Sequence, residues 1–286
     1  MAITQTSDLN SLYNQIYERA LFVLRETNLM VNLVSNYSAN TFYTRNITTR
    51  PTLTVETAAE AVDYTNAQSF GKTLVGTLTP QERIAQVVIT DIELMNDPDP
   101  TAADASQEMG AAMAAKIDTD LAALFPSFTT DKGPGAGSAA TIATVAAGIS
   151  VLQNRQAVQD GPINVVLHPY SWWSIWKLLG QPVSNAAFLG DLANQALRDY
   201  YVGNWLGVRW FTSSNIATDS GNDAVSGIFT QSALAFDSRI APYMETDRDP
   251  SLRATEWNLV CAYATGIGKR PNLGIKYTAA ADEPTS

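Results

Sequence analysis

Apolar residues recur at three- and four-residue steps over the segment that follows Asp99. Asp99 favours the N-cap of a helix, and Pro100 suits the first helical position, whose N–H has no partner within the helix. About 25 residues at 1.5 Å each predict a rod of about 37 Å, which is long for a globular domain. The residues predicted to share its apolar face are Met109, Met113, Ile117, Leu121 and Leu124.

A second helical pattern covers residues 8–35 near the start of the chain. It predicts an amphipathic helix whose aromatic and aliphatic face is a packing surface that something else must cover. The residues on this face are Leu9, Leu12, Tyr13, Ile16, Tyr17, Ala20, Leu21 and Leu24.

Between Thr41 and Asn96 the pattern changes to that of β-structure. Residues 52–57 and 86–92 alternate, and the run from Ile84 to Leu94 is strand-like. Between them, residues 58–83 are polar or small and include Gly71 and Gly76. A loop of that length is unusual inside a compact domain, so it predicts a projecting arm that docks on a neighbouring subunit.

The remainder of the chain mixes helices and strands and contains no internal repeat. A turn is expected at Ala235–Arg239, an acidic bend at Asp247–Pro250, and alternating strands between Arg239 and Tyr277. The other expected elements are a helix over 141–156, a buried strand over 163–167, a helix over 170–179, a strand over 207–211, and a polar loop over 213–227.

Composition excludes several classes of protein. The chain has 286 residues, of which 45% are apolar and 16% charged, so it can bury a sizeable core. Its net charge of −10 argues against tight binding to nucleic-acid phosphates. No run of 18 apolar residues predicts a membrane span, and the N-terminus lacks the layout of a signal peptide, which predicts a cytosolic product. The single cysteine, Cys261, lies in an apolar run typical of a buried thiol.

The sequence lacks the residues that most enzyme mechanisms need. His168 is the one histidine, no G-x-S-x-G motif supplies a nucleophile, and Asn66 replaces the first glycine of a phosphate-binding loop ending at Gly71-Lys72. We therefore predict no enzymatic activity and no cofactor. No metal site is predicted either, because the acidic cluster Asp91, Glu93, Asp97 and Asp99 lacks the spacing of a calcium loop.

The order of these elements resembles the major capsid proteins of tailed bacteriophages, which have the Hong-Kong-97-like fold. The resemblance rests on the passage from Thr79 to Phe125, on the strand–turn–helix unit over 163–179, and on the closing strands. It implies an α+β fold in four parts. These are an N-terminal arm with an amphipathic helix (1–48), an extended β-hairpin loop (49–96), a peripheral domain with the long spine helix (97–140 and 237–286), and an axial domain (141–236).

The resemblance also implies a function. The protein would self-assemble into hexamers and pentamers that form an icosahedral shell around double-stranded DNA, which it would enclose without tight binding. Expected partners are other copies of the chain, a separate scaffolding protein, a portal and a decoration protein, with no membrane. The protein would assemble in the host cytoplasm and reside in the virion capsid. The residues expected at contacts between subunits are Leu12, Ile16, Gly71 and Lys72.

Two alternatives belong to other classes. An encapsulin-like nanocompartment shell protein would have the same fold and enclose a cargo enzyme in place of a genome. A glycan-binding or hydrolytic protein would use Trp172, Trp173 and Trp176, since Trp172 and Trp176 are one helical turn apart and aromatic rings stack on sugars.

Overall fold

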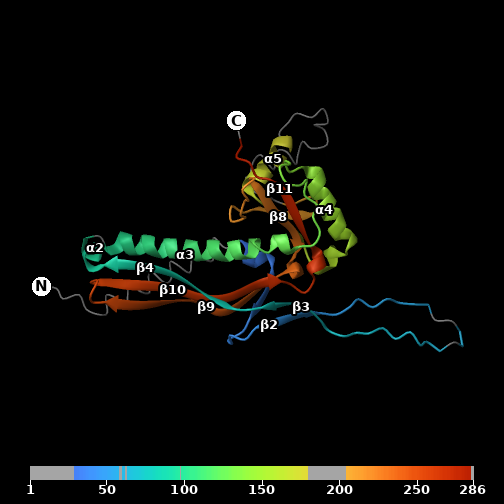
Figure 1. Cartoon of the computed structure of the whole chain (residues 1–286), viewed down its shortest axis with the longest axis horizontal. Coiled ribbons are helices and arrows are strands. Elements are labelled where there is room, and N and C mark those ends of the chain that lie inside the picture. Colours follow the sequence, from blue (N-terminus) through green and yellow to red (C-terminus); the bar gives the residue numbers. More distant parts are fainter. Residues whose placement is uncertain (1–28, 58–59, 62, 97, 180–203, 285–286) are drawn as a thin grey trace.

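The computed structural model describes residues 29–57, 60–61, 63–96, 98–179 and 204–284 (Figure 1). The helices are α2 (Asp91–Asn96), α3 (Pro98–Ala122), α4 (Ile142–Asn154) and α5 (Pro169–Leu179), with short 3₁₀ turns η1 (Met30–Leu33), η2 (Phe125–Ser127), η3 (Ala157–Asp160), η4 (Gln231–Ala233) and η5 (Pro271–Leu273). The strands are β1 (Ser35–Ser38), β2 (Arg45–Thr49), β3 (Thr73–Leu78), β4 (Gln81–Thr90), β5 (Ile163–Leu167), β6 (Asn204–Trp205), β7 (Val208–Thr212), β8 (Asp223–Thr230), β9 (Leu234–Asp249), β10 (Ala254–Ile267) and β11 (Gly274–Ala280).

Two sheets and a hairpin organise the described part of the chain. The long α3 runs beside a four-stranded sheet of order β1-β9-β10-β4, and both are elongated in the same direction (Figure 1). A five-stranded sheet of order β11-β8-β5-β7-β6, with α4 and α5 beside it, stands at one end of that body. The hairpin β2-β3 carries a long extension that projects away from both sheets. The mixture of helix and sheet confirms the predicted α+β class.

The predicted apolar face of α3 is confirmed for four of its five residues, and the fifth, Leu124, is half-buried and lies beyond the end of the helix at Ala122. Met109, Met113, Ile117 and Leu121 are buried, as the 3.6-residue period requires. The helix begins at Pro98 and not after an N-cap at Asp99, so the predicted start is wrong. The strand-like run to Leu94 also ends early, at Thr90, because residues 91–96 form α2, where acidic side chains in the first turn suit the helix dipole.

Several β-predictions fail because pairing, and not alternation, defines a strand. Residues 52–57 alternate but pair with nothing and are not a strand, whereas β3 and the start of β4 lie inside the loop predicted over 58–83. The turn predicted at Ala235–Arg239 is part of β9, because that segment pairs with β1 on one side and β10 on the other. The helix predicted over 8–35 gives way after η1 to β1; its first 21 positions lie outside the described residues.

The last third of the chain is divided between the two sheets. β9 and β10 form the long antiparallel pair of the four-stranded sheet, whereas β11 returns to pair with β8 in the five-stranded sheet. The predicted domain boundaries, which group 237–286 with the spine helix, therefore misplace residues 274–280. The predicted loop over 49–96 likewise includes β4, which pairs with β10 along ten residues. The predicted α4, β5 and α5 agree closely with the structure.

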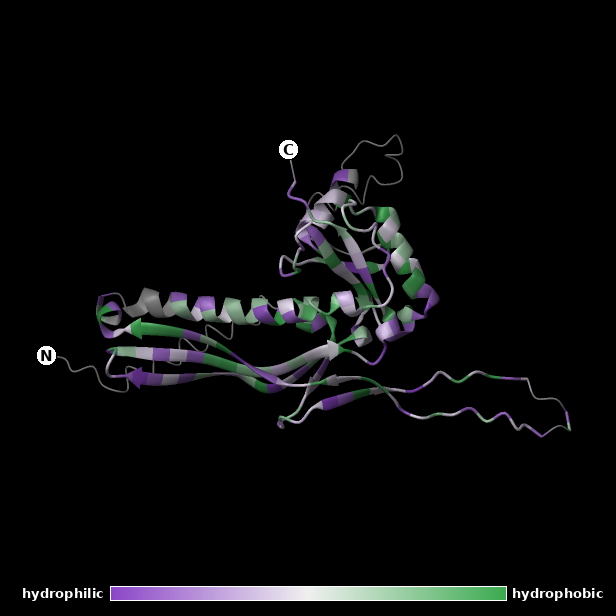
Figure 2. Cartoon of the chain, viewed as in Figure 1, coloured by the Kyte–Doolittle hydropathy of each residue, from purple (hydrophilic) through white to green (hydrophobic). Residues whose placement is uncertain are grey.

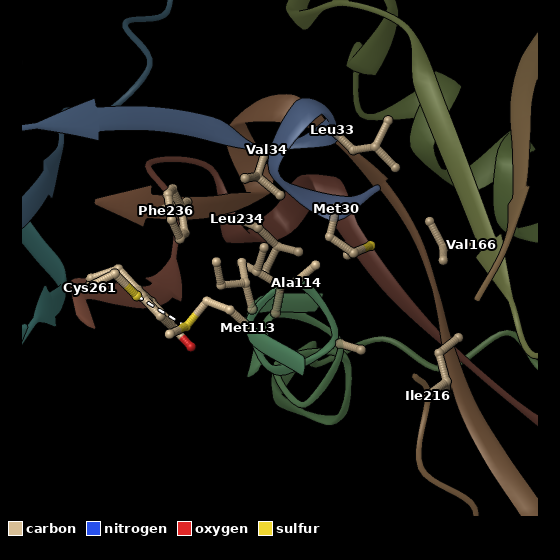
Figure 3. Close-up of a cluster of buried hydrophobic side chains, with 14 of the residues drawn as sticks. Met30, Leu33, Val34, Met113, Ala114, Val166, Ile216, Leu234, Phe236 and Cys261 are labelled. Carbon is tan, nitrogen blue, oxygen red and sulfur yellow. Dashed lines mark hydrogen bonds between the residues drawn. The ribbon is translucent and has the colours of Figure 1, made fainter. Parts of the chain in front are cut away.

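The largest hydrophobic core lies between α3 and the four-stranded sheet and extends to the five-stranded sheet (Figure 3). Phe229 of β8 contacts Phe125 and Phe128 at ring-centroid distances of 5.6 and 6.5 Å, which joins the two layers. Cys261 is buried in the same core with its Sγ 3.3 Å from Met113 Sδ. Hydrophobic and hydrophilic residues alternate along α3, hydrophobic ones gather at the end of β4, and hydrophilic ones gather at the far end of β9 (Figure 2).

Candidate functional site

The projecting segment between β2 and β3, residues 50–72, is here named the arm. Every described arm residue is exposed, and none of them belongs to a helix or a strand. In Figure 1 its two sides run alongside one another away from the body. The arm nevertheless carries large apolar side chains: Leu53 is 53% exposed, Val55 100% and Phe70 49%. Exposed apolar side chains concentrated on one projection indicate a surface that contacts another molecule.

Each hydrogen bond between the described residues of the arm's two sides involves a side chain on at least one side. The N–H of Thr54 donates to Oε1 of Gln68 at 2.9 Å, and Nε2 of Gln68 donates to the carbonyl of Thr54 at 2.6 Å. Nearer the tip, Nδ2 of Asn66 donates to both carboxylate oxygens of Glu56 at 2.9 and 3.0 Å. The hydroxyl of Tyr64 also donates to Glu56, at 3.4 Å.

The base of the arm is buried, in contrast to the arm itself. Ile47 of β2 and Leu78 of β3 pack with Ala235 of β9 and Ala264 of β10 in a small separate core. A Cβ at Gly266 of β10 would come within 2.5 Å of Leu78 Cδ2, so glycine at that position allows the hairpin to sit directly on the sheet.

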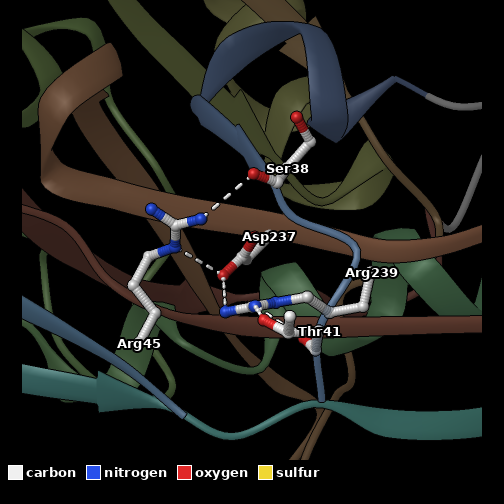
Figure 4. Close-up of polar contacts among 5 residues, drawn as sticks. All are labelled: Ser38, Thr41, Arg45, Asp237 and Arg239. Carbon is white, nitrogen blue, oxygen red and sulfur yellow. Dashed lines mark hydrogen bonds and ion pairs between the residues drawn. The ribbon is translucent and has the colours of Figure 1, made fainter. Parts of the chain in front are cut away.

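A buried ion-pair junction ties the arm's base to the four-stranded sheet (Figure 4). Asp237 of β9 is fully buried, and its Oδ2 accepts from Nε of Arg45 at 2.7 Å and from Nη2 of Arg239 at 2.6 Å. Arg45, the first residue of β2, also donates to the carbonyl of Ser38 at 3.1 Å, and Arg239 donates to the carbonyl of Thr41 at 2.8 Å. The junction, here named the Asp237 junction, therefore fixes the segment from β1 to β2 on β9.

A second anchor holds the first described residues against α3. Asp118 accepts from the N–H of Leu29 at 3.1 Å and from the N–H of Met30 at 3.0 Å. Burial raises the pKa of Asp118 and outweighs the two backbone hydrogen bonds, which act in the opposite direction. Leu12 and Ile16, the predicted contacts of the N-terminal helix, lie outside the described residues. The sequence analysis missed this role of Asp118, because its partner Met30 lies 88 residues away along the chain.

Asp120, two residues further along α3, bonds to different partners. It accepts from Nζ of Lys116 at 2.7 Å, from the hydroxyl of Tyr263 at 2.8 Å, and from Nη2 of Arg83 at 3.3 Å. Burial acts to raise the pKa of Asp120, but these hydrogen bonds and the charges of Lys116 and Arg83 outweigh it and lower the pKa. The two aspartates therefore do not act as a pair; each joins α3 to another element.

The two predicted contact residues of the arm, Gly71 and Lys72, lie just before β3 and are exposed. A Cβ at Gly71 would meet no atom closer than Ser69 Oγ at 3.9 Å, so neither space nor backbone conformation demands glycine there within the subunit. Their participation in contacts between subunits remains a prediction.

The residues behind the alternative functions are dispersed. Trp172 packs on the buried Trp210 at 5.4 Å, whereas Trp173 and Trp176 stack on each other at 4.8 Å, so the three indoles do not form one platform. His168 is buried, its Nδ1 accepts from the N–H of Tyr170 at 3.3 Å, and burial lowers its pKa.

Within the described residues, no three His, Cys, Asp or Glu side chains come together as metal ligands. Among the helices of these same residues, none combines the length and apolar character needed to cross a membrane.

Comparison with known proteins gives one family and many structural neighbours. The family described as phage capsid protein matches residues 75–276, which is 202 of the 286 residues. No curated protein sequence matches the chain. Among solved structures, Mycobacterium phage Che8 aligns with a TM-score of 0.69 at 22% identity over 87% of this chain and 90% of that chain.

Two further neighbours extend the range of assemblies with this fold. The bacteriophage PhiM1 mature capsid has a TM-score of 0.66 at 15% identity, covering 90% of this chain and 88% of that one. A virus-like particle from Pyrococcus furiosus has a TM-score of 0.60 at 10% identity, covering 93% and 98%. At these identities the structures establish the fold, and the sequence match, which includes α3 and every strand from β4 to β10, establishes the family. The chain belongs to the phage capsid protein family.

Proposed function

We propose that this protein is the major capsid protein of a tailed phage and that its arm is a principal contact between subunits. The observation that carries the proposal is the contrast between an exposed, apolar-bearing arm and its buried base. The family match indicates a structural role in a capsid. Copies of the chain assemble into hexamers and pentamers, and these close into an icosahedral shell around double-stranded DNA.

Repetition explains how modest contacts suffice. Each subunit offers its arm to one neighbour and receives an arm from another, so the contact is heterologous and closes into rings. Because each ring engages many such contacts together, a small free energy per contact stabilises a closed shell. Within this scheme the long α3 and its sheet supply a stiff body, and the five-stranded sheet forms the axial domain at the centre of each ring.

The remaining partners follow from the same scheme. A separate scaffolding protein guides assembly in the host cytoplasm, a portal occupies one vertex, and a decoration protein binds the finished virion. The net charge of −10 suits a container that holds DNA without binding it tightly. Gly71 and Lys72, at the end of the arm that leads into β3, contact neighbouring subunits, as do Leu12 and Ile16.

A nanocompartment shell protein is the rival with the same fold, and the likeness to the Pyrococcus furiosus particle is a specific reason to test it. The two functions differ in contents. Particles that protect DNA from nuclease support the capsid function, and particles that enclose a protein cargo and no DNA support the rival.

Electron microscopy of the purified protein, alone and co-expressed with the candidate scaffolding protein, tests the proposal. Closed shells, or rings of five and six subunits, are the expected result. A stable monomer or dimer under both conditions, at concentrations up to the millimolar range, would refute it.

A further inference from the structure

The hydrogen bonds across the arm continue the register of the hairpin at its base. In the paired part, Thr48 lies opposite Leu74 and Thr49 opposite Thr73. The first bonded pair is Thr54 with Gln68. Thr54 lies five residues after Thr49 on the outgoing side, and Gln68 lies five residues before Thr73 on the returning side. Two residues further out on each side are Glu56 and Asn66, the second pair. The arm therefore keeps hairpin register beyond the end of the hairpin.

The hydrogen bonds that join the two sides of the arm differ from those of a β-ladder, because each of them involves a side chain. Among the described arm residues, the backbone-to-backbone hydrogen bond present is that from the N–H of Ala67 to the carbonyl of Thr65, on the returning side alone. The primary amide of Gln68 carries two N–H donors and a carbonyl acceptor, and it uses one of each on the backbone of Thr54, as an opposite strand would. A side chain thus occupies the place of a backbone partner.

The two bonded pairs, Gln68 with Thr54 and Asn66 with Glu56, are here named the rungs. They have a consequence that a backbone ladder lacks. Paired strands lie about 4.8 Å apart because their N–H and C=O groups bond directly. Where the bond passes through a side chain, the backbone groups around it remain unpaired and exposed. The pairing groups of both sides then stay available to a partner polypeptide, while the rungs limit the conformations that the arm samples.

We propose that Gln68 and Asn66 are positioning residues that hold the free arm extended and in register before it docks on a neighbouring subunit. This inference rests on the proposed function and names how that site is prepared. A segment that adopts its binding conformation for only a fraction of the time has its apparent affinity reduced by that fraction, here named the competent fraction. The two rungs raise that fraction and occupy the backbone groups of Thr54 alone, so the pairing groups of the arm residues around it stay available for docking.

The first test measures the arm in the unassembled subunit, kept below the concentration at which shells form. Nitroxide labels on Thr57→Cys and Thr65→Cys, the next positions in the same register, report the separation of the two sides. Cys261 does not interfere, because it is buried and burial raises the pKa of its thiol to about 12. The reference arm is expected to give one narrow distance distribution.

Removing the rungs is expected to broaden that distribution. The test variant combines Gln68→Ala with Asn66→Ala, and the matched control is Ser69→Ala, which changes a neighbouring exposed arm residue with no hydrogen bond recorded in the described structure. A third variant, Glu56→Gln, keeps an acceptor for Asn66 and is expected to preserve the narrow distribution. An unchanged distribution in the double variant overturns the proposal.

Assembly supplies the second readout. The concentration at which shells appear is expected to rise about tenfold in the double variant relative to Ser69→Ala, because the variant loses both exposed rungs and the competent fraction of the arm falls. A broadened arm with the same assembly threshold overturns the claim that the rungs serve docking. The failures are distinguishable, because a reference protein that never forms shells refutes the proposed function, whereas the distance measurement judges the rungs alone.

Discussion

The arm and the body, by which we mean α3 with the two sheets and the helices beside them, differ in the burial of their side chains, although one chain forms both. In the body, α3 and the four-stranded sheet bury an apolar face, and even their polar anchors Asp118 and Asp237 are buried and bonded. In the arm, every described side chain is exposed and the rungs are in contact with water. The body can therefore be expected to carry the free energy of folding, and the arm that of association.

This difference predicts that similar chemical changes have unequal effects in the two regions. A change in the body is expected to act on unfolding, and any effect on assembly would follow from loss of the fold. A change in the arm is expected to act on assembly while unfolding stays constant. Four predictions follow this contrast from the largest effect on unfolding to the smallest.

The largest effect is expected for Phe229→Ala in the body. Its ring is fully buried against Phe125 and Phe128, so the substitution removes a large apolar group and leaves a cavity between the two sheets. A loss of about 3–5 kcal/mol in the free energy of unfolding is expected. Urea denaturation followed by circular dichroism measures it.

The matched change in the arm is Phe70→Ala. That ring is 49% exposed, and its contact is the Arg50 guanidinium at 4.7 Å from the ring centroid. A loss of less than about 1 kcal/mol is expected. Equal losses for the two phenylalanines would contradict the division between body and arm.

The Asp237 junction lies on the boundary between the two regions, and Asp237→Asn is expected to have the second largest effect. The substitution leaves Arg239, whose side chain is 3% exposed, without its charged partner. Breaking a buried pair on one side costs about 3 kcal/mol. Asp247→Asn, an exposed change on the same strand, is expected to stay within about 0.5 kcal/mol. Amide exchange of β2 should accelerate in the first variant only.

Local periodicity explains why much of the body could be predicted from the sequence. Met109, Met113 and Ile117 repeat at the helical period, and the buried run over 163–167 followed by a turn predicts β5 and α5 without knowledge of the rest of the fold. Each of these patterns depends on residues within one element. The predicted arm was correct only in part: a projection is present, but it covers residues 50–72, whereas the stretch predicted over 58–83 also contains β3 and the start of β4.

Long-range pairing explains what could not be predicted. The segment 235–239 resembles a turn by composition and is a strand because β1, some 200 residues earlier in the chain, pairs beside it. Asp237 gains its role from Arg45, which is 192 residues away. The placement of β11 with β8 has the same origin. No local pattern records such partners, so the anchors of the arm were missed while its existence was not.

Acid titration distinguishes Asp118 from Asp120, the two polar anchors on α3. Its expected effect on the free energy of unfolding is smaller than that of Asp237→Asn. The lowered pKa of Asp120 means that its contribution to stability is present above the unfolded pKa of about 3.9 and is lost as the pH falls through the folded pKa. The raised pKa of Asp118 has the opposite sign: its contribution is complete below about 3.9 and is lost as the pH rises through the folded pKa.

Asp120→Asn and Asp118→Asn should therefore change stability with opposite pH dependences between about pH 3 and 6. Denaturant midpoints measured across that range, each relative to the unsubstituted protein, provide the test. Parallel curves for the two variants would show that the two carboxylates share one environment and would contradict their separate roles on α3.

The smallest effect on unfolding, and the clearest separation of the two regions, is expected for Val55→Asp. Val55 is 100% exposed, so the free energy of unfolding should change by less than about 0.5 kcal/mol. Docking of the arm would bury this side chain, and a carboxylate there would have to be desolvated, so the shell yield should fall at least about tenfold at equal subunit concentration. Val158→Asp, at a 68% exposed valine of η3, controls for adding a negative charge to a folded subunit. Light scattering measures the yield, and denaturation of the unassembled subunit measures stability. A Val55→Asp protein that unfolds early, or one that assembles as well as the Val158→Asp control, would remove the distinction between a body that folds and an arm that associates.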